Sequence, residues 1–367
     1  MILINDIVVL HNYSLQEHNS LKINSIAEFY TEIFHIDILM HLMNHNFFND
    51  KEFKIIGNGT NILLKKKFYN GIIIKNSMFD KIVFSINEDN CIEMTVASGE
   101  EVEYLIMAYI NYQEENDIIA YGLENLTGIP GSIGAAVCLN IGAYGVEQKD
   151  FFVSCEAINM KTRETRTFSK EECLFDYRSS YFTKNPNEYF ITYVKYAVPI
   201  NNKPFLYYKE LNSHFITNDI KPRHIFDFVK EIRSNKIPNP LFNPNAGSFF
   251  KNPIVSKDKL HNILKLHPDI KYEKLVLDTD DFTNESSPLN YNSNNREVFK
   301  ISAAYLIENC GLKGYRSGEV GISNKHALII INYGNATGKD IINFSNFIIQ
   351  QVSAKYNITL TPEVIFI

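Results

Sequence analysis

Two glycine-rich segments carry residue types that could bind an anionic ligand. The first, Gly57–Asn61 (GNGTN), brackets an Asn with two glycines between β-rich runs, so several backbone amides could turn toward one anion. A tight hairpin turn explains the same residues equally well. The Rossmann fingerprint is excluded, because it needs a third glycine and a following helix, whereas the residues that follow predict more strand.

The second segment, Gly122–Gly145, carries six glycines in 24 residues, far above their average usage of about 7%. Such a backbone can approach a pyrophosphate closely, Ser132 and Asn140 can donate to its oxygens, and Tyr144 can pack on a ring. The alternative is an elaborate pair of loops with Tyr144 in the core.

A serine lies in the loop Asn245–Pro253 (NAGSFFKNP). The GxSxG pattern is absent around Ser248, so a hydrolase triad is not expected. A role as proton donor fits better, but a serine hydroxyl is a poor acid and needs a strongly basic partner such as a carbanion or enolate. Capping of a turn is the structural alternative.

Two charged residues stand out from their surroundings. Arg178 lies beside hydroxyls in YRSSYF, and Glu363 lies in the otherwise apolar end TPEVIFI. An arginine can hold a substrate carboxylate with two parallel hydrogen bonds, and a desolvated carboxyl group can take part in enol chemistry. A salt bridge between the two residues is the alternative.

No metal site is expected. His41 and His45 lie one helical turn apart, but Leu42 replaces the Glu of HExxH, and a solvated helix face is the better interpretation. The five cysteines form no CxxC pair and are expected to be reduced thiols. The run Lys65–Lys67 is expected at the exposed end of a strand.

Composition indicates a globular protein with two or three domains. The chain has 367 residues, of which 45% are hydrophobic and 21% charged, which excludes full-length disorder. A net charge of −6 excludes binding to nucleic acid or anionic membranes by electrostatics alone. The opening residues do not predict a secretory signal, and no run of about 20 apolar residues is present. A soluble, cytoplasmic protein is expected.

Hydrophobic periodicity predicts a mixed α and β chain. One amphipathic helix, or two that meet near His35, is expected over residues 26–46, a meander of strands over 53–86, and a surface insertion over 278–296. Gly122–Gly145 is expected to be loop. Further helices are predicted at 100–115, 222–236, 258–266, 302–310 and 339–356, and further strands at 153–159, 165–168, 188–198, 327–332 and 363–367.

Taken in order, the motifs resemble those of the UDP-N-acetylenolpyruvoylglucosamine reductases, also called UDP-N-acetylmuramate dehydrogenases, the flavoenzymes of peptidoglycan precursor synthesis. The resemblance covers nearly the whole chain, from HNSLKI through GNGTNILL, ASGE, GLENLTGIPGSIG, NIGAYGVE, YRSSYF, NAGSFFKNP and LIENCGLKG to PEVIFI.

This resemblance implies an α+β fold with a two-part FAD-binding region of the vanillyl-alcohol-oxidase (PCMH) type and a C-terminal α+β substrate-binding domain. The implied limits are 1–74 and 75–221 for the two FAD-binding subdomains and 222–367 for the substrate domain, whose last strand, 363–367, returns to the active site. The residues implied to bind FAD are Gly57, Asn58, Gly59, Thr60, Asn61, Gly99, Asn125, Ile129, Pro130, Gly131, Ser132, Gly134, Asn140, Gly142, Ala143, Tyr144 and Gly145.

The resemblance also implies a reaction in which NADPH reduces FAD and the enolpyruvyl ether of a UDP-sugar then accepts hydride from flavin N5 at its C3. Ser248 is implied to protonate C2, while Arg178 and Glu363 hold the carboxylate and stabilise the enolic intermediate. These small molecules are the expected partners, and a monomer without nucleic acid or membrane partners is expected. The implied substrate-binding residues are Tyr177, Tyr208, Lys236, Lys251, Asn252 and Tyr291, with Tyr272 as the alternative to Tyr291.

Three features depart from the family pattern: the 278–296 insertion, Lys22 where relatives commonly have glycine, and Ile365 at a position that is often basic. None removes an implied catalytic group. Two other functions stay open, a flavin-dependent oxidoreductase of the same fold with another substrate, and a flavin- or nucleotide-binding protein without turnover.

Overall fold

The computed structural model describes residues 2–4, 7–45, 48, 51–80, 82–216, 220–276 and 297–367. The chain forms two compact units, Met1–Lys236 together with Ile367, and Ile237–Phe366. The compact units divide after Lys236. The domain limits at 74 and 221 stay predictions.

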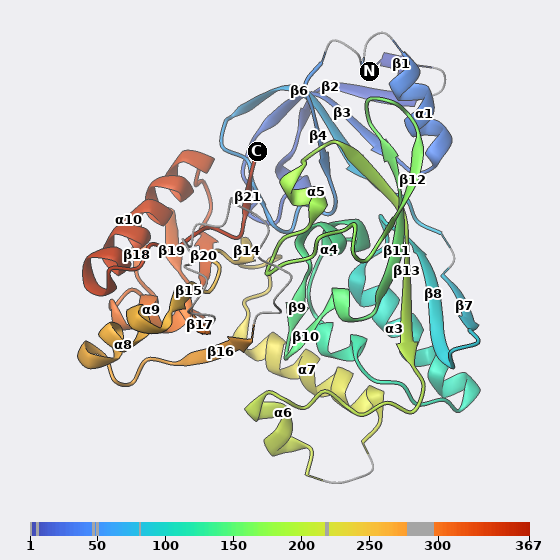
Figure 1. Ribbon diagram of the computed structural model, residues 1–367. Coiled ribbons are helices and arrows are strands. Elements are labelled where there is room, and N and C mark those ends of the chain that lie inside the picture. Colours follow the sequence, from blue (N-terminus) through green and yellow to red (C-terminus); the bar gives the residue numbers. More distant parts are fainter. Residues whose placement is uncertain are drawn as a thin grey trace. The chain divides into compact units, whose positions relative to one another are not determined.

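The first unit begins with a five-stranded sheet in the order β1-β2-β3-β6-β4 (Figure 1). Strand β3 pairs antiparallel with β2 and parallel with β6, and β4 is also parallel to β6. Apolar side chains of helix α1 and of this sheet share one core. The elements are β1 (Ile2–Ile4), β2 (Ile7–Ser14), β3 (Ile26–Ile33), α1 (Ile36–Asn44), β4 (Phe53–Ile56) and β6 (Phe68–Asn76).

Two predictions for this region were wrong. Residues Ile26–Ile33 form strand β3 and only Ile36–Asn44 is helical. Phe29, Tyr30 and Thr31 are buried in succession, so the strand lacks the alternation that normally marks β structure. The strands are also not a simple meander, because α1 connects β3 to β4 and both pair with β6 in parallel.

The second sheet of this unit is antiparallel, in the order β12-β11-β13-β8-β7. Apolar residues of helices α3 and α4 join its core. Helix α4 corrects the expectation of continuous loop within the glycine-rich segment. The elements are β7 (Val83–Ile86), β8 (Cys91–Ala97), α3 (Val102–Asn116), α4 (Ile133–Leu139), β11 (Phe152–Asn159), β12 (Thr165–Ser169) and β13 (Tyr189–Pro199).

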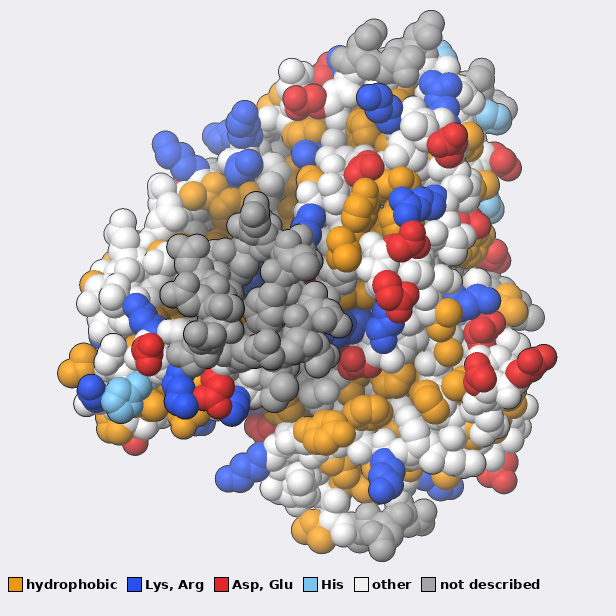
Figure 2. All heavy atoms as spheres, viewed as in Figure 1, with side chains coloured by type: hydrophobic (Ala, Val, Ile, Leu, Met, Phe, Trp, Pro, Cys, Tyr) orange, Lys and Arg blue, Asp and Glu red, His pale blue; other side chains and the backbone are white. Residues whose placement is uncertain are grey.

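Helix α7 (Pro222–Lys236) is held on α3 by ion pairs. Arg223 lies 2.7 Å from Glu114, and Lys230 lies 2.6 Å from Glu103. On the face of this unit visible in Figure 2, basic and acidic side chains are interspersed. The remaining short elements of the unit are η1 (Gln16–His18), β5 (Ile62–Leu63), η2 (Leu123–Leu126), β9 (Gly142–Ala143), β10 (Val146–Glu147), η3 (Gln148–Asp150), α5 (Tyr181–Lys184) and α6 (Lys209–His214).

The second unit contains a four-stranded sheet, β14-β20-β19-β18, and a three-stranded sheet, β15-β17-β16, both antiparallel. Helix α10 packs on β19, and α8 packs on β15 and β17. The elements are β14 (Asn245–Ser248), β15 (Ile254–Ser256), α8 (Lys257–Leu266), β16 (Tyr272–Val276), β17 (Glu297–Ile301), α9 (Ala303–Asn309), β18 (Arg316–Ser317), β19 (Val320–Ile322), β20 (Ile329–Asn332), α10 (Gly338–Tyr356) and β21 (Ile365–Phe366).

The other predicted helices and strands are confirmed, with shifts of a few residues at their ends. The predicted insertion at 278–296 lies outside the described residues. All five cysteines are free thiols, and His41, His45 and Lys65–Lys67 are exposed, as expected. Among the described helices, none combines the length and apolar character that crossing a bilayer requires.

Candidate functional site

The two glycine-rich loops lie against each other in the first unit. The Thr60 hydroxyl donates to the Pro130 carbonyl at 3.1 Å. A Cβ atom added to Gly57 would lie 2.3 Å from Ser132 Oγ, and one added to Gly131 would lie 3.0 Å from Thr60 Oγ1. Glycine is therefore needed where the loops approach each other, and the backbones of GNGTN and IPGSIG together form one small-residue surface.

The second half of the glycine-rich segment is tied together by asparagine side chains. Asn125 donates to the carbonyls of Tyr144 at 3.0 Å and Phe205 at 2.8 Å. Asn140, in the left-handed region with a φ of 43°, donates to the Glu147 carboxylate at 3.0 Å. The buried Asn125 Oδ1 has no hydrogen-bond partner in the structure. A buried acceptor of this kind beside a glycine-rich surface suits a ligand that donates a hydrogen bond.

Arg178 is brought to this same loop. Its Nη2 donates to the Gly142 carbonyl at 2.6 Å and its Nη1 to the Asn140 carbonyl at 3.3 Å. Its guanidinium also lies 3.9 Å from the Glu147 carboxylate and over the Tyr177 ring. The loop thus fixes the position of a cation beside the predicted ligand surface.

One aromatic residue and two further cations lie near Tyr144. The Tyr208 ring meets the Tyr144 ring edge-on at 5.5 Å, and Lys236 forms a 2.8 Å ion pair with Glu210. Burial raises the pKa of Tyr144, and the charges of Arg233 and Lys236 partly oppose that shift. Sequence reasoning missed Arg233, whose side chain lies against Gly128 and whose buried Nε has no partner in the structure. Its helical position carried no signal of a site.

The other predicted flavin residues support the loops. A Cβ on Gly99 would lie 2.4 Å from the Met78 nitrogen, and one on Gly145 would lie 3.3 Å from the Tyr207 ring. Gly134 donates from its backbone to the Ser98 carbonyl at 2.7 Å. Ile129 and Ala143 are partly buried and pack against the core of the second sheet.

Glu124, also missed, is a fully buried carboxyl group in the same segment. Both its oxygens accept from the Gly122 amide, at 2.7 and 2.8 Å. Burial raises the pKa of Glu124 to about 8, and the hydrogen bonds from its own backbone and that of Gly122 oppose the shift only in part. The folded protein therefore retains a proton between pH 4.5 and 8 that the unfolded chain releases.

Because the folded protein retains this proton, we expect the free energy of unfolding to fall as the pH rises from 4.5 to 8. One such group contributes a slope of up to about 1.4 kcal/mol per pH unit. Urea unfolding at a series of pH values measures it. Glu124→Gln should flatten the dependence, whereas Glu115→Gln, on an exposed residue of α3, should leave it unchanged. Equal slopes for wild type and Glu124→Gln would contradict the account.

In the second unit, Ser248 and Glu363 belong to adjacent segments. Ser248 ends β14 and is exposed, opposite Ile329 in the sheet register. The Glu363 amide donates to the Phe249 carbonyl at 2.8 Å, and Phe250 pairs with Pro362. These backbone contacts join the segments that carry Ser248 and Glu363, which are more than 100 residues apart in sequence.

The remaining predicted substrate residues lie in different parts of the second unit, and one of them lies outside the described residues. The Lys251 amide donates to the Thr361 carbonyl at 2.9 Å, next to the Glu363 segment. Asn252 Oδ1 accepts from the Ala303 amide at the start of α9, at 2.9 Å, which gives this side chain a structural role. Tyr272 is half-exposed on β16, and Tyr291 lies outside the described residues.

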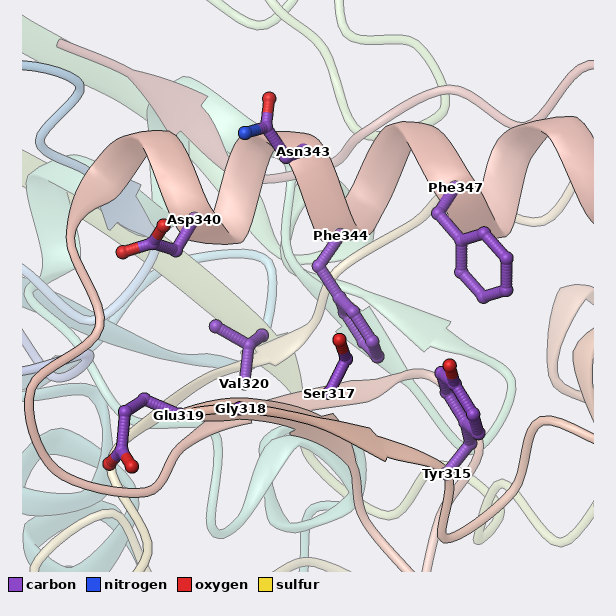
Figure 3. Close-up of a pocket in the computed structure, with 9 residues that line it drawn as sticks. All are labelled: Tyr315, Ser317, Gly318, Glu319, Val320, Asp340, Asn343, Phe344 and Phe347. Atoms are coloured by element: carbon purple, nitrogen blue, oxygen red, sulfur yellow. The ribbon is translucent and has the colours of Figure 1, made fainter.

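A separate pocket of about 500 Å³ lies in the second unit between the β18–β19 hairpin and α10 (Figure 3). Tyr315, Phe344 and Phe347 line one end, and Glu319 and Asp340 lie toward the other. It contains none of the predicted site residues. Within the described ranges, no group of three or more His, Cys, Asp or Glu side chains is arranged to hold a metal ion.

Each of the two units contains residues that match a known protein family. Residues 239–367 match the family model of the UDP-N-acetylenolpyruvoylglucosamine reductase C-terminal domain, and residues 39–167 match an FAD-binding domain. The chain is 34% identical to the UDP-N-acetylenolpyruvoylglucosamine reductase of Flavobacterium johnsoniae over 96% of its length and 98% of the relative. The chain belongs to this family. It is 34% identical to the reductase of Porphyromonas gingivalis over 98% of its length and 99% of the relative.

Membership of the UDP-N-acetylenolpyruvoylglucosamine reductase family makes the chain an FAD-dependent oxidoreductase of peptidoglycan synthesis. The fold agrees with that of the Thermus caldophilus reductase, with a TM-score of 0.61 at 20% identity over 98% of both chains. The predicted α+β class, with an FAD-binding region and a C-terminal substrate domain, is thereby confirmed.

The residues of the first unit fit FAD on structural grounds. Where Thr60 meets Pro130, the glycines let the two loop backbones approach each other more closely than side chains would allow, and glycine-rich backbone of this kind suits an anionic cofactor. The orphan Asn125 Oδ1 adds a buried acceptor next to the Tyr144 loop.

Proposed function

We propose that the chain catalyses the NADPH-dependent reduction of UDP-N-acetylglucosamine enolpyruvate to UDP-N-acetylmuramate. The observation that carries this proposal is the similarity to named reductases over almost the entire chain, with Ser248, Arg178 and Glu363 all present. Geometry supports it, because Glu363 is tied by its backbone to the segment that follows Ser248.

We assign the two glycine-rich loops of the first unit to FAD. FAD bound by these loops and reduced by NADPH would supply the hydride that is added to C3 of the enolpyruvyl group. The backbone of the loops would approach the pyrophosphate, and Tyr144 would contribute its ring on the flavin side of the site. The residues that would hold the cofactor are Gly57, Asn58, Gly59, Thr60, Asn61, Gly99, Asn125, Ile129, Pro130, Gly131, Ser132, Gly134, Asn140, Gly142, Ala143, Tyr144 and Gly145.

Ser248 delivers a proton to C2 of the substrate. Hydride addition at C3 leaves an electron pair at C2 that is delocalised into the carboxylate, and this carbon is basic enough to take the hydroxyl proton. The exposed position of Ser248 at the end of β14 leaves its hydroxyl accessible to a ligand. Gly247, with a φ of 69° and open space around it, gives the backbone the left-handed turn just before the serine.

Arg178 and Glu363 are assigned to the enolic intermediate, where the Arg178 cation can offset the negative charge that develops on the substrate. Arg178 is already oriented by the Gly142 and Asn140 carbonyls, so little reorganisation is needed when it meets a carboxylate. The Glu363 amide donates to the Phe249 carbonyl, which fixes the backbone position of this residue. A preorganised cation such as Arg178 stabilises a transition state more than a flexible one does.

The substrate diphosphate and sugar are assigned to residues with phosphate-binding chemistry. Lys236 and Lys251 supply cations, Asn252 supplies an amide, and aromatic rings supply stacking surfaces. The tyrosines in this role are Tyr177, Tyr208 and one of Tyr291 or Tyr272.

Steady-state turnover tests the proposed reaction. The purified protein with FAD should oxidise NADPH beyond one equivalent per flavin only when UDP-N-acetylglucosamine enolpyruvate is present. Each further NADPH consumed should yield one molecule of UDP-N-acetylmuramate, which carries two more hydrogen atoms than the substrate. Sustained oxidation of NADPH that is independent of this substrate would contradict the proposal and favour another flavoenzyme activity.

A further inference from the structure

A chain of hydrogen-bonded side chains lies behind the GNGTN loop. The Tyr13 hydroxyl lies 3.1 Å from His18 Nε2, and the Tyr30 hydroxyl lies 3.2 Å from His18 Nδ1. The Tyr30 hydroxyl donates to Glu32 at 2.7 Å. The Tyr13 and Tyr30 rings stack at 4.4 Å. We call Tyr13, His18, Tyr30 and Glu32 the His18 relay.

Glu32 determines which atom donates in each hydrogen bond of this relay. Burial pushes the pKa of Glu32 upward, but hydrogen bonds from Tyr30 and Ser77 and the charge of Lys75 outweigh burial and leave the pKa below its ordinary value. The ionised carboxylate can only accept, so the Tyr30 proton points to Glu32 and the Tyr30 oxygen must accept from His18 Nδ1–H. The Tyr13 proton then points to His18 Nε2. The relay is consistent with only one neutral tautomer, protonated at Nδ1.

The backbone next to His18 contacts the GNGTN loop directly. The Ser20 amide donates to the Gly59 carbonyl at 3.0 Å, and the Ser20 hydroxyl donates to the Thr60 carbonyl at 3.1 Å. A Cβ on Gly59 would lie 1.9 Å from the His18 carbonyl oxygen. Buried Asn19 fixes this segment through bonds to Leu15 and Ile23. The imidazole and the loop are therefore connected through one short, well-bonded stretch of backbone.

We infer that the His18 relay is a positioning device that holds the GNGTN loop in its ligand-binding geometry, and that it makes FAD affinity depend on a neutral His18. The inference rests on the assignment of this loop to FAD. It assigns a role in FAD binding to the His18 relay, none of whose side chains belongs to the GNGTN loop.

The pH dependence has a defined sign. His18 is faced by Tyr13 on β2, by Tyr30 and Glu32 on β3, and by the charges of Lys75, Glu17 and Lys22. Burial lowers the pKa of His18 from 6.5, Lys75 adds to that effect, and Glu32 and Glu17 oppose it. As the pH falls below 6.5, protonation of His18 converts Nε2 from an acceptor into a donor and breaks the bond from Tyr13. FAD binding should weaken in that direction.

The experiment measures the FAD dissociation constant of the apoprotein at pH values above and below 6.5. Wild-type protein should lose up to about tenfold in affinity per pH unit as His18 is protonated. His18→Gln cannot keep both ring hydrogen bonds in place and should bind FAD about tenfold more weakly, with a flattened pH profile. His41→Gln, at an exposed histidine of the same unit, serves as the matched control and should behave as wild type.

A second variant and a second readout keep the test decisive. Tyr13→Phe preserves the ring stack and removes only the hydroxyl, so it remains informative if His18→Gln does not fold. Nitrogen-15 NMR of the apoprotein should show His18 protonated at Nδ1 in wild type and a mixture of tautomers in Tyr13→Phe.

Three outcomes would overturn the inference. If His18→Gln and Tyr13→Phe both bind FAD with the affinity and pH profile of the wild type, the inference is wrong and the proposed function is unaffected. Protonation of neutral His18 at Nε2 in the wild type would do the same. A wild-type protein that binds no FAD would overturn the proposed function together with it, so the two failures are distinguishable.

Discussion

Replacing Ser248 by alanine is expected to reduce product formation by about 10²–10⁴-fold, the range that a positioned general acid contributes. Reduction of the flavin by NADPH should be unchanged, because the serine acts only after hydride transfer to the substrate. Rapid-mixing absorbance measurements separate the two half-reactions, the first observed with NADPH and the second with UDP-N-acetylglucosamine enolpyruvate.

Ser317→Ala is the matched control for this prediction. Ser317 is also exposed at the end of a strand in the four-stranded sheet of the second unit, but it lines the separate pocket beside α10. Both half-reactions should proceed normally in this variant. Unchanged product formation in Ser248→Ala would refute the assignment of Ser248 as proton donor.

Replacing Gly59 by alanine is expected to abolish FAD binding, with a loss of affinity of at least about 100-fold. The new Cβ would lie 1.9 Å from the His18 carbonyl oxygen, a backbone atom, so the collision can be relieved only by moving the backbone of GNGTN or of the His18 segment. The φ of Gly59 is 68°, so alanine is also strained there. Fluorescence titration of the apoprotein with FAD measures the effect.

Gly311→Ala separates the collision from the backbone strain. Gly311 has a similar φ of 73°, but a Cβ atom added there would have no neighbour within 4 Å, so alanine should cost only about 1 kcal/mol of stability. Its FAD affinity should equal that of wild type. An equal loss of affinity in both variants, or none in Gly59→Ala, would contradict the loop geometry described above.

Residues whose role depends on local chemistry could be predicted from the sequence. GNGTN and IPGSIG each contain a glycine at positive φ, Gly59 and Gly131, and the structure places the two loops in contact. Helix α7 was predicted almost to the residue, because Pro222 begins it and the prolines that follow Lys236 prevent its continuation.

Features that depend on distant contacts could not be predicted. Strand β3 has apolar spacing that fits a helix, and only its central position between β2 and β6 makes it a strand. Likewise, the His18 relay depends on the register of β2, β3 and their neighbours, which brings Tyr13 beside Tyr30. The buried state of Glu124 depends on tertiary packing, and nothing in the GLEN tetrapeptide marks it.

The most direct test of the proposed function is a single anaerobic turnover of the FAD-loaded protein. NADPH should bleach the flavin absorbance, and subsequent addition of UDP-N-acetylglucosamine enolpyruvate should restore it with the formation of one equivalent of UDP-N-acetylmuramate. A flavin that stays reduced after this addition would contradict the assigned substrate, and a protein that takes up no FAD would contradict the assigned cofactor site.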